Sequence, residues 1–136
     1  PTTAHDVVFT LDLARDPQVG FARAADLTTL ADARALDDTT LALTFAAPQP
    51  GFPGVLCELP IVPRHLLADV PRAALRQAPF ERAPVGNGPF RFVSREPGAR
   101  WTFARNDAFP RSMGGPPRMR RLVVADLLFA EENLPM

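Results

Sequence analysis

The stretch Pro84-Val85-Gly86-Asn87-Gly88-Pro89-Phe90-Arg91-Phe92 carries the strongest structural signal in the chain. Glycine and asparagine tolerate a positive φ, so residues 86–88 predict a tight loop. Apolar and polar residues then alternate up to Arg95 and again over residues 100–106. Between the two runs, Pro97-Gly98 occupies the central positions that a type II turn requires. The sequence therefore predicts an antiparallel β-hairpin over residues 88–106, with an apolar face of Phe90, Phe92, Trp101 and Phe103.

Two segments nearer the N-terminus also predict regular structure. Thr3 can cap a helix, and Asp6 puts a negative charge near the positive end of its dipole. Residues 7–10 would also suit a strand, but the cap favours a helix, which ends at Asp16-Pro17. Residues 31–36 and 40–45 alternate on either side of Asp37-Asp38, which predicts a second hairpin. Its core-facing residues are Leu41, Leu43 and Phe45.

The remaining segments predict short elements, because the chain has 16 prolines scattered along it. Residues 48–63 should be irregular, with one short helix near residues 53–59. Pro63 and Pro71 can each begin another short helix. Residues 118–125 read as a final strand, after a loop over residues 107–117. The expected fold is α+β, with an antiparallel or mixed sheet, two hairpins and several short helices, in a single domain over residues 1–136.

The composition is that of a soluble globular domain, with 46% hydrophobic and 22% charged residues. The formal net charge is zero, which argues against a general nucleic-acid or membrane-surface binder. All the basic residues are arginine, which indicates a coding bias more than a choice at each position. No apolar run reaches the ~18 residues of a membrane span. The chain starts at Pro1 without an initiator methionine or a visible signal peptide, so we expect it to derive from a longer or processed polypeptide.

No catalytic, metal-binding or cofactor-binding residues can be assigned from the sequence. His5 and His65 lack metal-site spacing, so His5 is expected as a polar residue in the first turn of a helix and His65 at the surface of a short helix. Cys57 could pair with His65 as a thiol and imidazole, but its apolar neighbours favour a packing role. Asp37-Asp38 is more typical of a turn than of an acid pair. The cluster Arg118, Arg120, Arg121 is either a solvated strand face or a site for an anionic partner, and the first interpretation is favoured.

Six segments in order resemble one family. Residues 1–11 are similar to its Pro-x-Thr-Ala-Glu-Asp-Val-x-Phe-Ser/Thr-Leu, and residues 35–41 to its Ala-x-Asp-Asp-x-Thr-Val hairpin. Residues 59–66 are similar to Pro-Ile-x-Pro-Lys-His, and residues 84–90 to Pro-Val-Gly-Thr-Gly-Pro-Tyr. Residues 105–117 contain counterparts of Arg-Asn-x-x-Tyr and Gly-Gly-x-Pro. The family is that of the extracytoplasmic solute-binding proteins, which deliver oligopeptides, dipeptides and sometimes nickel or sugars to ABC importers. The chain departs from it at His5 and Asn87, where the family usually has Glu and Thr.

This resemblance implies a fragment of a two-lobed periplasmic-binding-protein fold. The chain corresponds to part of the first lobe, mostly its peripheral subdomain. The implied function is binding without catalysis. A peptide or other small solute would be bound between this lobe and a second lobe. The implied partner is an ABC importer permease, and the implied location is periplasmic or extracytoplasmic, with a lipid anchor as an option in the full-length protein. No cofactor, nucleic acid or direct membrane span is expected, and the ligand-binding residues stay unassigned. The alternative is a stand-alone interaction module.

Overall fold

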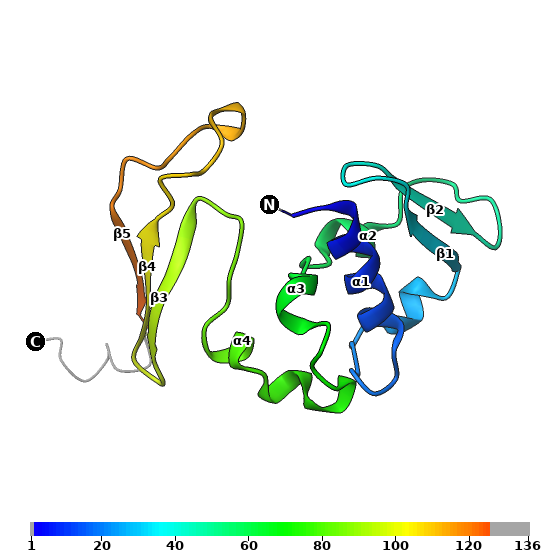
Figure 1. The fold of residues 1–136 in the computed structure, drawn as a ribbon, viewed down its shortest axis with the longest axis horizontal. Coiled ribbons are helices and arrows are strands. Elements are labelled where there is room, and N and C mark those ends of the chain that lie inside the picture. Colours follow the sequence, from blue (N-terminus) through cyan, green and yellow to red (C-terminus); the bar gives the residue numbers. More distant parts are fainter. Residues whose placement is uncertain (1, 126–136) are drawn as a thin grey trace, which may run out of the picture. The chain divides into compact units, whose positions relative to one another are not determined.

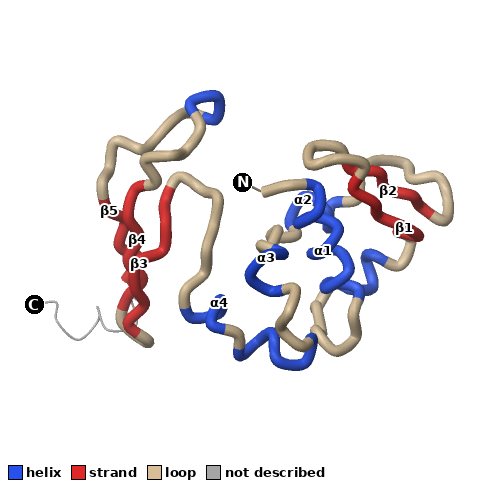
Figure 2. The backbone as a smooth tube through the Cα atoms, viewed as in Figure 1, coloured by secondary structure: helices blue, strands red, loops and turns tan. Residues whose placement is uncertain are grey.

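The computed structural model describes residues 2–125 of the chain. The chain divides into two compact units, Pro1–Ala78 and Pro79–Met136 (Figure 1). Helices and strands are mixed, and the strands form one two-stranded and one three-stranded antiparallel sheet (Figure 2). The predicted α+β class with two hairpins is therefore confirmed.

The first unit is built around α1 (Ala4–Arg15), which begins after the predicted cap at Thr3 and ends at Asp16. Its buried side contributes to a small apolar core, whose buried members are Leu11, Ala14, Leu27, Leu30 and Val55. The other elements of this unit are the 3₁₀ helices Ala24–Leu27 and Arg72–Gln77, the strands β1 (Leu30–Ala35) and β2 (Leu41–Phe45), and the short helices α2 (Gly54–Glu58) and α3 (Arg64–Leu67). Both short helices follow a proline, as the sequence predicts.

The predicted hairpin between residues 31 and 45 is formed by β1 and β2. Asp37 closes its turn, because one carboxylate oxygen accepts hydrogen bonds from the N–H groups of Thr39 and Thr40, both at 2.8 Å. These bonds, with one from the Thr39 hydroxyl, lower the pKa of Asp37 to about 2. Leu43 and Phe45 pack against the core, as expected. Asp37 is therefore a turn residue, as the sequence favoured.

The second unit contains α4 (Pro79–Arg82), a 3₁₀ turn (Arg111–Met113) and the strands β3 (Phe90–Glu96), β4 (Arg100–Arg105) and β5 (Arg121–Ala125), in the order β3-β4-β5. Gly98 has a φ of +72°, and the N–H of Ala99 donates to the carbonyl of Glu96 at 3.0 Å. The predicted hairpin and its turn are therefore confirmed. The final strand is shorter than predicted, because the register with β4 begins only at Arg121.

The aromatic face of this sheet is only half-buried. Phe92 meets the ring of Trp101 edge-on at 6.1 Å and that of Phe103 at 6.2 Å between centroids. No residue between 79 and 125 is fully buried, so the expectation that Trp101 and Phe103 are core residues was too strong. Alternation correctly predicted which residues share a face, but burial also depends on what covers that face.

Candidate functional site

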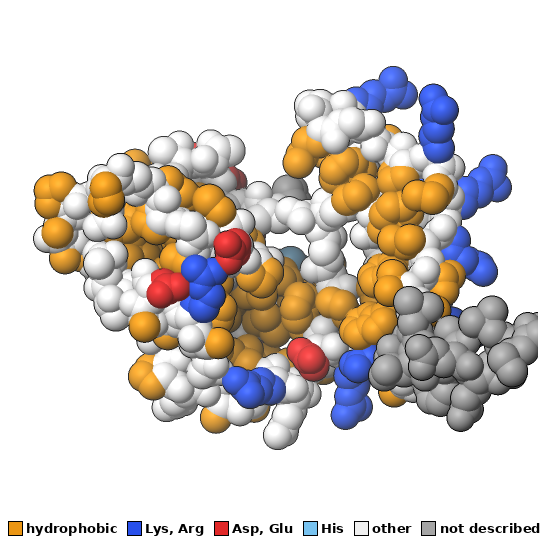
Figure 3. All heavy atoms as spheres, turned by 180° about the vertical axis from the view of Figure 1, so that it is seen from behind, with side chains coloured by type: hydrophobic (Ala, Val, Ile, Leu, Met, Phe, Trp, Pro, Cys, Tyr) orange, Lys and Arg blue, Asp and Glu red, His pale blue; other side chains and the backbone are white. Residues whose placement is uncertain are grey.

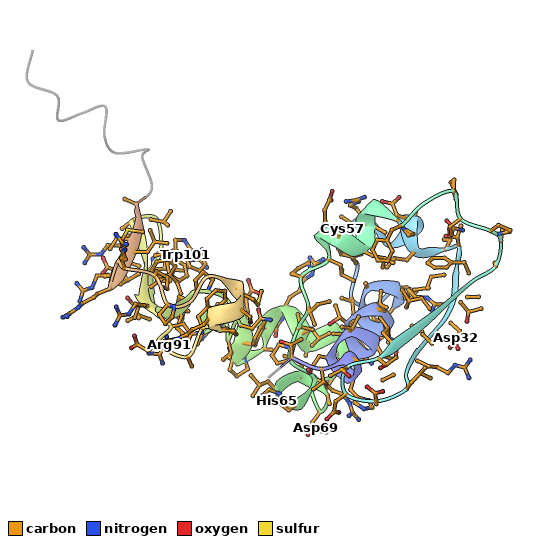
Figure 4. All side chains as sticks on the ribbon, turned by 90° about the horizontal axis from the view of Figure 1, so that it is seen from above. Asp32, Cys57, His65, Asp69, Arg91 and Trp101 are labelled. Atoms are coloured by element: carbon orange, nitrogen blue, oxygen red, sulfur yellow. The ribbon has the colours of Figure 1, made fainter. Side chains whose placement is uncertain are left out.

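An open depression in the first unit gathers polar side chains from the starts of α1 and α3. Its volume is about 400 Å³. It brings together the only two histidines of the chain, which lie 60 positions apart in the sequence. Both are helical, as predicted, and both are exposed. Figure 4 shows His65 and Asp69 at one edge of this unit. The lining residues are Thr3, His5, Asp6, Arg64, His65, Ala68 and Asp69.

Asp6 fixes the floor of this depression. It forms a capping box with Thr3, whose N–H donates to the Asp6 carboxylate at 2.8 Å. The other carboxylate oxygen accepts from the backbone N–H of Arg64, also at 2.8 Å. Hydrogen bonds from Thr3 lower the pKa of Asp6, the bond from Arg64 and the nearby His65 act in the same direction, and burial opposes them. The side chain is 8% exposed. Asp6 thus joins the starts of α1 and α3 through hydrogen bonds, and its carboxylate is not available to a ligand.

Thr10, one helical turn further along α1, makes a second link between α1 and the segment that leads into α3. Its hydroxyl donates to the carbonyl of Asp6 at 2.7 Å and accepts from the N–H of Val62 at 3.0 Å. Together, Asp6 and Thr10 hold the segment 62–64 against α1. This segment begins α3 and therefore sets the position of His65.

The turn of the first hairpin is attached near the same place. The N–H of Ala4 donates to the carbonyl of Asp38 at 2.8 Å. The ring nitrogen Nε2 of His5 lies 3.7 Å from a carboxylate oxygen of Asp38, and both side chains are exposed. An exposed pair at this distance contributes little to stability.

The chemistry available in the depression is polar recognition. His5, Arg64 and His65 can donate hydrogen bonds, and Asp69 can accept them. Small-molecule sites usually bury 70–90% of the ligand in a largely apolar cavity, and this open surface offers one polar wall. Among residues 2–125, no group of three or more His, Cys, Asp or Glu side chains is placed to hold a metal ion.

Cys57 is exposed, so the prediction of a packing role was wrong. It lies on α2, a helix of little more than one turn, whose Val55 is buried and whose Leu56 contacts the core (Figure 4). With Val55 turned inward, Cys57 points away from the core. A one-turn helix is too short for sequence periodicity to reveal this orientation.

The arginine cluster is exposed, as favoured. Arg118 and Arg120 lie in the segment that leads into β5, and Arg121 is the first residue of that strand. The loop at residues 86–88 serves the scaffold, since the side-chain amide of Asn106 donates to the carbonyl of Gly88 at 2.9 Å.

Residues 1–126 match the model of the bacterial extracellular solute-binding proteins, family 5 Middle. The chain belongs to this family, whose members are binding proteins. Among described residues, no helix is long and apolar enough to cross a membrane. The resemblance seen in the sequence is therefore confirmed.

Individual relatives agree with this assignment. A Brucella ovis protein, named as an ABC transporter peptide-binding protein, is 31% identical over 124 residues, which is 90% of this chain and 23% of the relative. The oligopeptide-binding protein AppA of Bacillus subtilis, solved with a nonapeptide, has a TM-score of 0.80 and 26% identity over 90% of this chain and 24% of its own. A periplasmic oligopeptide-binding protein of Thermotoga maritima, solved with mannohexaose, has a TM-score of 0.79 and 30% identity over 97% of this chain and 24% of its own. The chain thus spans about a quarter of the length of the relatives it matches.

Proposed function

We propose that this chain is the first-lobe part, mostly the peripheral subdomain, of a solute-binding protein that delivers a peptide or related small solute to an ABC importer. The observation that carries the proposal is the likeness to solved solute-binding proteins, which extends over 90–97% of this chain but only 24% of theirs. In this proposal, residues 1–136 serve as one structural piece of a larger two-lobed binder.

The open depression supports binding by enclosure. One polar wall buries only part of a ligand, and affinity rises when a second surface excludes water from the rest. Lobe closure would supply that surface. The depression is a candidate wall for such a site, with Arg64, His65 and Asp69 as its exposed charged or polar groups.

The proposed function is binding without catalysis. A thiol nucleophile needs a base within hydrogen-bonding reach, and Cys57 has no hydrogen bond to a histidine in the described part of the chain. The carboxylate with the lowered pKa in the depression, Asp6, is already used by the backbone N–H groups of Thr3 and Arg64. We further propose that the protein works outside the cytoplasm, where it would meet an importer permease.

Calorimetric titration with a mixture of di- to pentapeptides tests this proposal. The 136-residue chain alone should bind in the millimolar range, because losing ~4 kcal/mol of contacts weakens a micromolar site about a thousandfold. A longer protein that contains this chain and a second lobe should bind in the micromolar range, and mass spectrometry of co-purifying solutes should identify its ligand.

Two results would contradict the proposal. Low micromolar binding by the 136-residue chain alone would mean that it holds a complete site, as a stand-alone module would. If the two-lobed protein neither co-purified with a solute nor bound one in the titration, the proposed function would be wrong.

A further inference from the structure

The zero net charge of the chain hides an uneven distribution. Residues 79–125 carry nine arginines and three carboxylates, whereas residues 1–78 carry six arginines and nine carboxylates. With the three acids of residues 126–136 included, arginines still outnumber acids nine to six from residue 79 onward. The excess of basic residues therefore belongs to the second unit, and the net charge of the whole chain does not reveal it.

The sheet of the second unit concentrates part of this charge on one face. Arg91 of β3 and Arg121 of β5 are both paired with Ala104 of β4, so the two arginines flank a small residue on the same face. This is the face opposite Phe92 and Phe103, because side chains alternate along each strand. Ser94 and Thr102 continue it as the next paired row. We call the surface formed by Arg91, Ala104, Thr102 and Arg121, with Arg118 and Arg120 at its edge, the arginine face.

The arginines that define this face lack acidic partners in the described part of the chain; Arg100, two residues before Thr102 in β4 and therefore on the same face, is paired with Glu96. Arg105 is paired with Asp107, whereas no ion pair joins Arg91, Arg118, Arg120 or Arg121 to a described carboxylate. Arginine side chains project from the edge of this unit, at the right of Figure 3.

Exposed apolar side chains lie among these arginines. Val123 of β5 is 48% exposed and shares its row with Thr102, and Met119, between Arg118 and Arg120, is 59% exposed. Val93, at the register shift in β3, is 55% exposed. Arginines interspersed with exposed apolar groups suit a surface that has anionic groups outside and hydrocarbon beneath.

We infer that the arginine face docks on an anionic phospholipid bilayer. Guanidinium groups pair with lipid phosphates in a bidentate manner, and Val123 and Met119 can enter the headgroup region. Three strands spaced about 4.8 Å apart, each with about six residues rising 3.3 Å, give a face of roughly 300 Å². A stable protein complex buries about 800 Å² on each partner, so the face is small for a protein but sufficient for attachment through charge. Such attachment would concentrate a solute-binding protein beside the membrane.

Vesicle sedimentation with the 136-residue chain tests this inference. Vesicles of phosphatidylcholine with about one-third phosphatidylglycerol, at about 50 mM salt, should retain the chain, and pure phosphatidylcholine vesicles should not. The triple variant R91Q/R118Q/R121Q should bind about 100-fold more weakly, since each arginine near an anionic bilayer raises binding about fivefold. The matched control R15Q/R34Q/R82Q removes the same charge at exposed positions that are not part of this face and should lose much less. Circular dichroism checks that both variants are folded.

The inference would be overturned by no retention of the unmodified chain on anionic vesicles, by equal weakening in the two triple variants, or by equal retention on zwitterionic vesicles. Retention on immobilised polyglutamate without retention on vesicles would also overturn it and would indicate an acidic protein partner. None of these measurements depends on solute binding, so they do not test the proposed function.

Discussion

Replacing Asp6 with asparagine should destabilise the first unit and leave the second unchanged. The carboxylate accepts hydrogen bonds from the N–H groups of Thr3 and Arg64 through its two oxygens, both at 2.8 Å. An asparagine of the same shape offers only one oxygen, so one of the two N–H groups would face an amide NH₂. The capping box and the attachment of α3 cannot then both be kept.

The expected cost follows from these bonds. A hydrogen bond to a charged group contributes about 1.5–3 kcal/mol, and an unsatisfied buried donor costs a similar amount. Asp6 lies in a small unit with solvent nearby, and screening there favours the low end. We therefore expect a loss of about 2 kcal/mol in the free energy of unfolding at pH 7. With a urea m-value near 2 kcal/mol per molar, the unfolding midpoint falls by about 1 M.

The pH dependence gives an independent check. The pKa of Asp6 is lowered in the folded chain below the value of 3.8 expected when unfolded. A depressed carboxyl pKa stabilises the fold at pH values above the unfolded pKa, and this contribution is lost as the pH falls through the folded pKa. The difference between the unmodified chain and Asp6→Asn should therefore be full at pH 7 and shrink below pH 3.8.

Urea unfolding followed by two signals measures this effect. Far-UV circular dichroism follows mainly the helices, most of which lie in the first unit, and the fluorescence of Trp101 follows the second. The matched control is Asp12→Asn, an exposed change on the same helix, which should shift neither transition. Equal midpoints for the two variants, or a deficit in Asp6→Asn that persists unchanged at pH 2, would refute the reasoning.

Further predictions follow from single residues. Gly98→Val should cost at least ~1 kcal/mol, because Gly98 has a φ of +72°, whereas Gly86→Val, in open space without a positive φ, should cost much less in thermal melts. Phe103→Ala should cost about 2 kcal/mol, below the 3–5 kcal/mol typical of fully buried aromatics, because its ring is half-buried; an unchanged melting temperature would place it outside the aromatic cluster. NMR titration of the Asp37 carboxyl should give a pKa of about 2, and a normal value would rule out its turn bonds. Cys57 should react with a thiol reagent as fast in the native chain as in denaturant, and strong native protection would contradict its exposure.

Local signals predicted most of the secondary structure. The pair Thr3 and Asp6 marks the start of α1, Asp37 marks one hairpin turn, and Pro97-Gly98 marks the other. Each signal works through bonds or dihedral angles within a few residues, so the sequence alone contains it. The antiparallel pairing of the two strands in each hairpin also follows from local sequence, because a short turn connects them.

The features that were missed depend on long-range contacts. The hydrogen bond from the N–H of Arg64 to Asp6 joins residues 58 positions apart, and no pattern in either segment predicts it. The same bond brings His65 to the depression beside His5, so the candidate site could not be assembled from spacing. Cys57 and Phe103 were misjudged for a related reason, because their burial depends on what packs against a one-turn helix or a sheet face.

The same contacts explain why the sequence identifies the family but not the ligand. The motif at residues 1–11 bonds to the motif at residues 35–41 through Ala4 and Asp38, and to the motif at residues 59–66 through Asp6 and Arg64. The motif at residues 105–117 bonds to the one at residues 84–90 through Asn106, whose amide and N–H reach Gly88 and Pro89. These segments therefore hold the scaffold together through hydrogen bonds to one another. Residues that hold backbone segments together are constrained by the fold and not by the solute, so a chain can keep them while its binding wall carries different side chains. The proposed ligand contacts therefore lie among exposed groups that these hydrogen bonds do not use, such as His65 and Asp69.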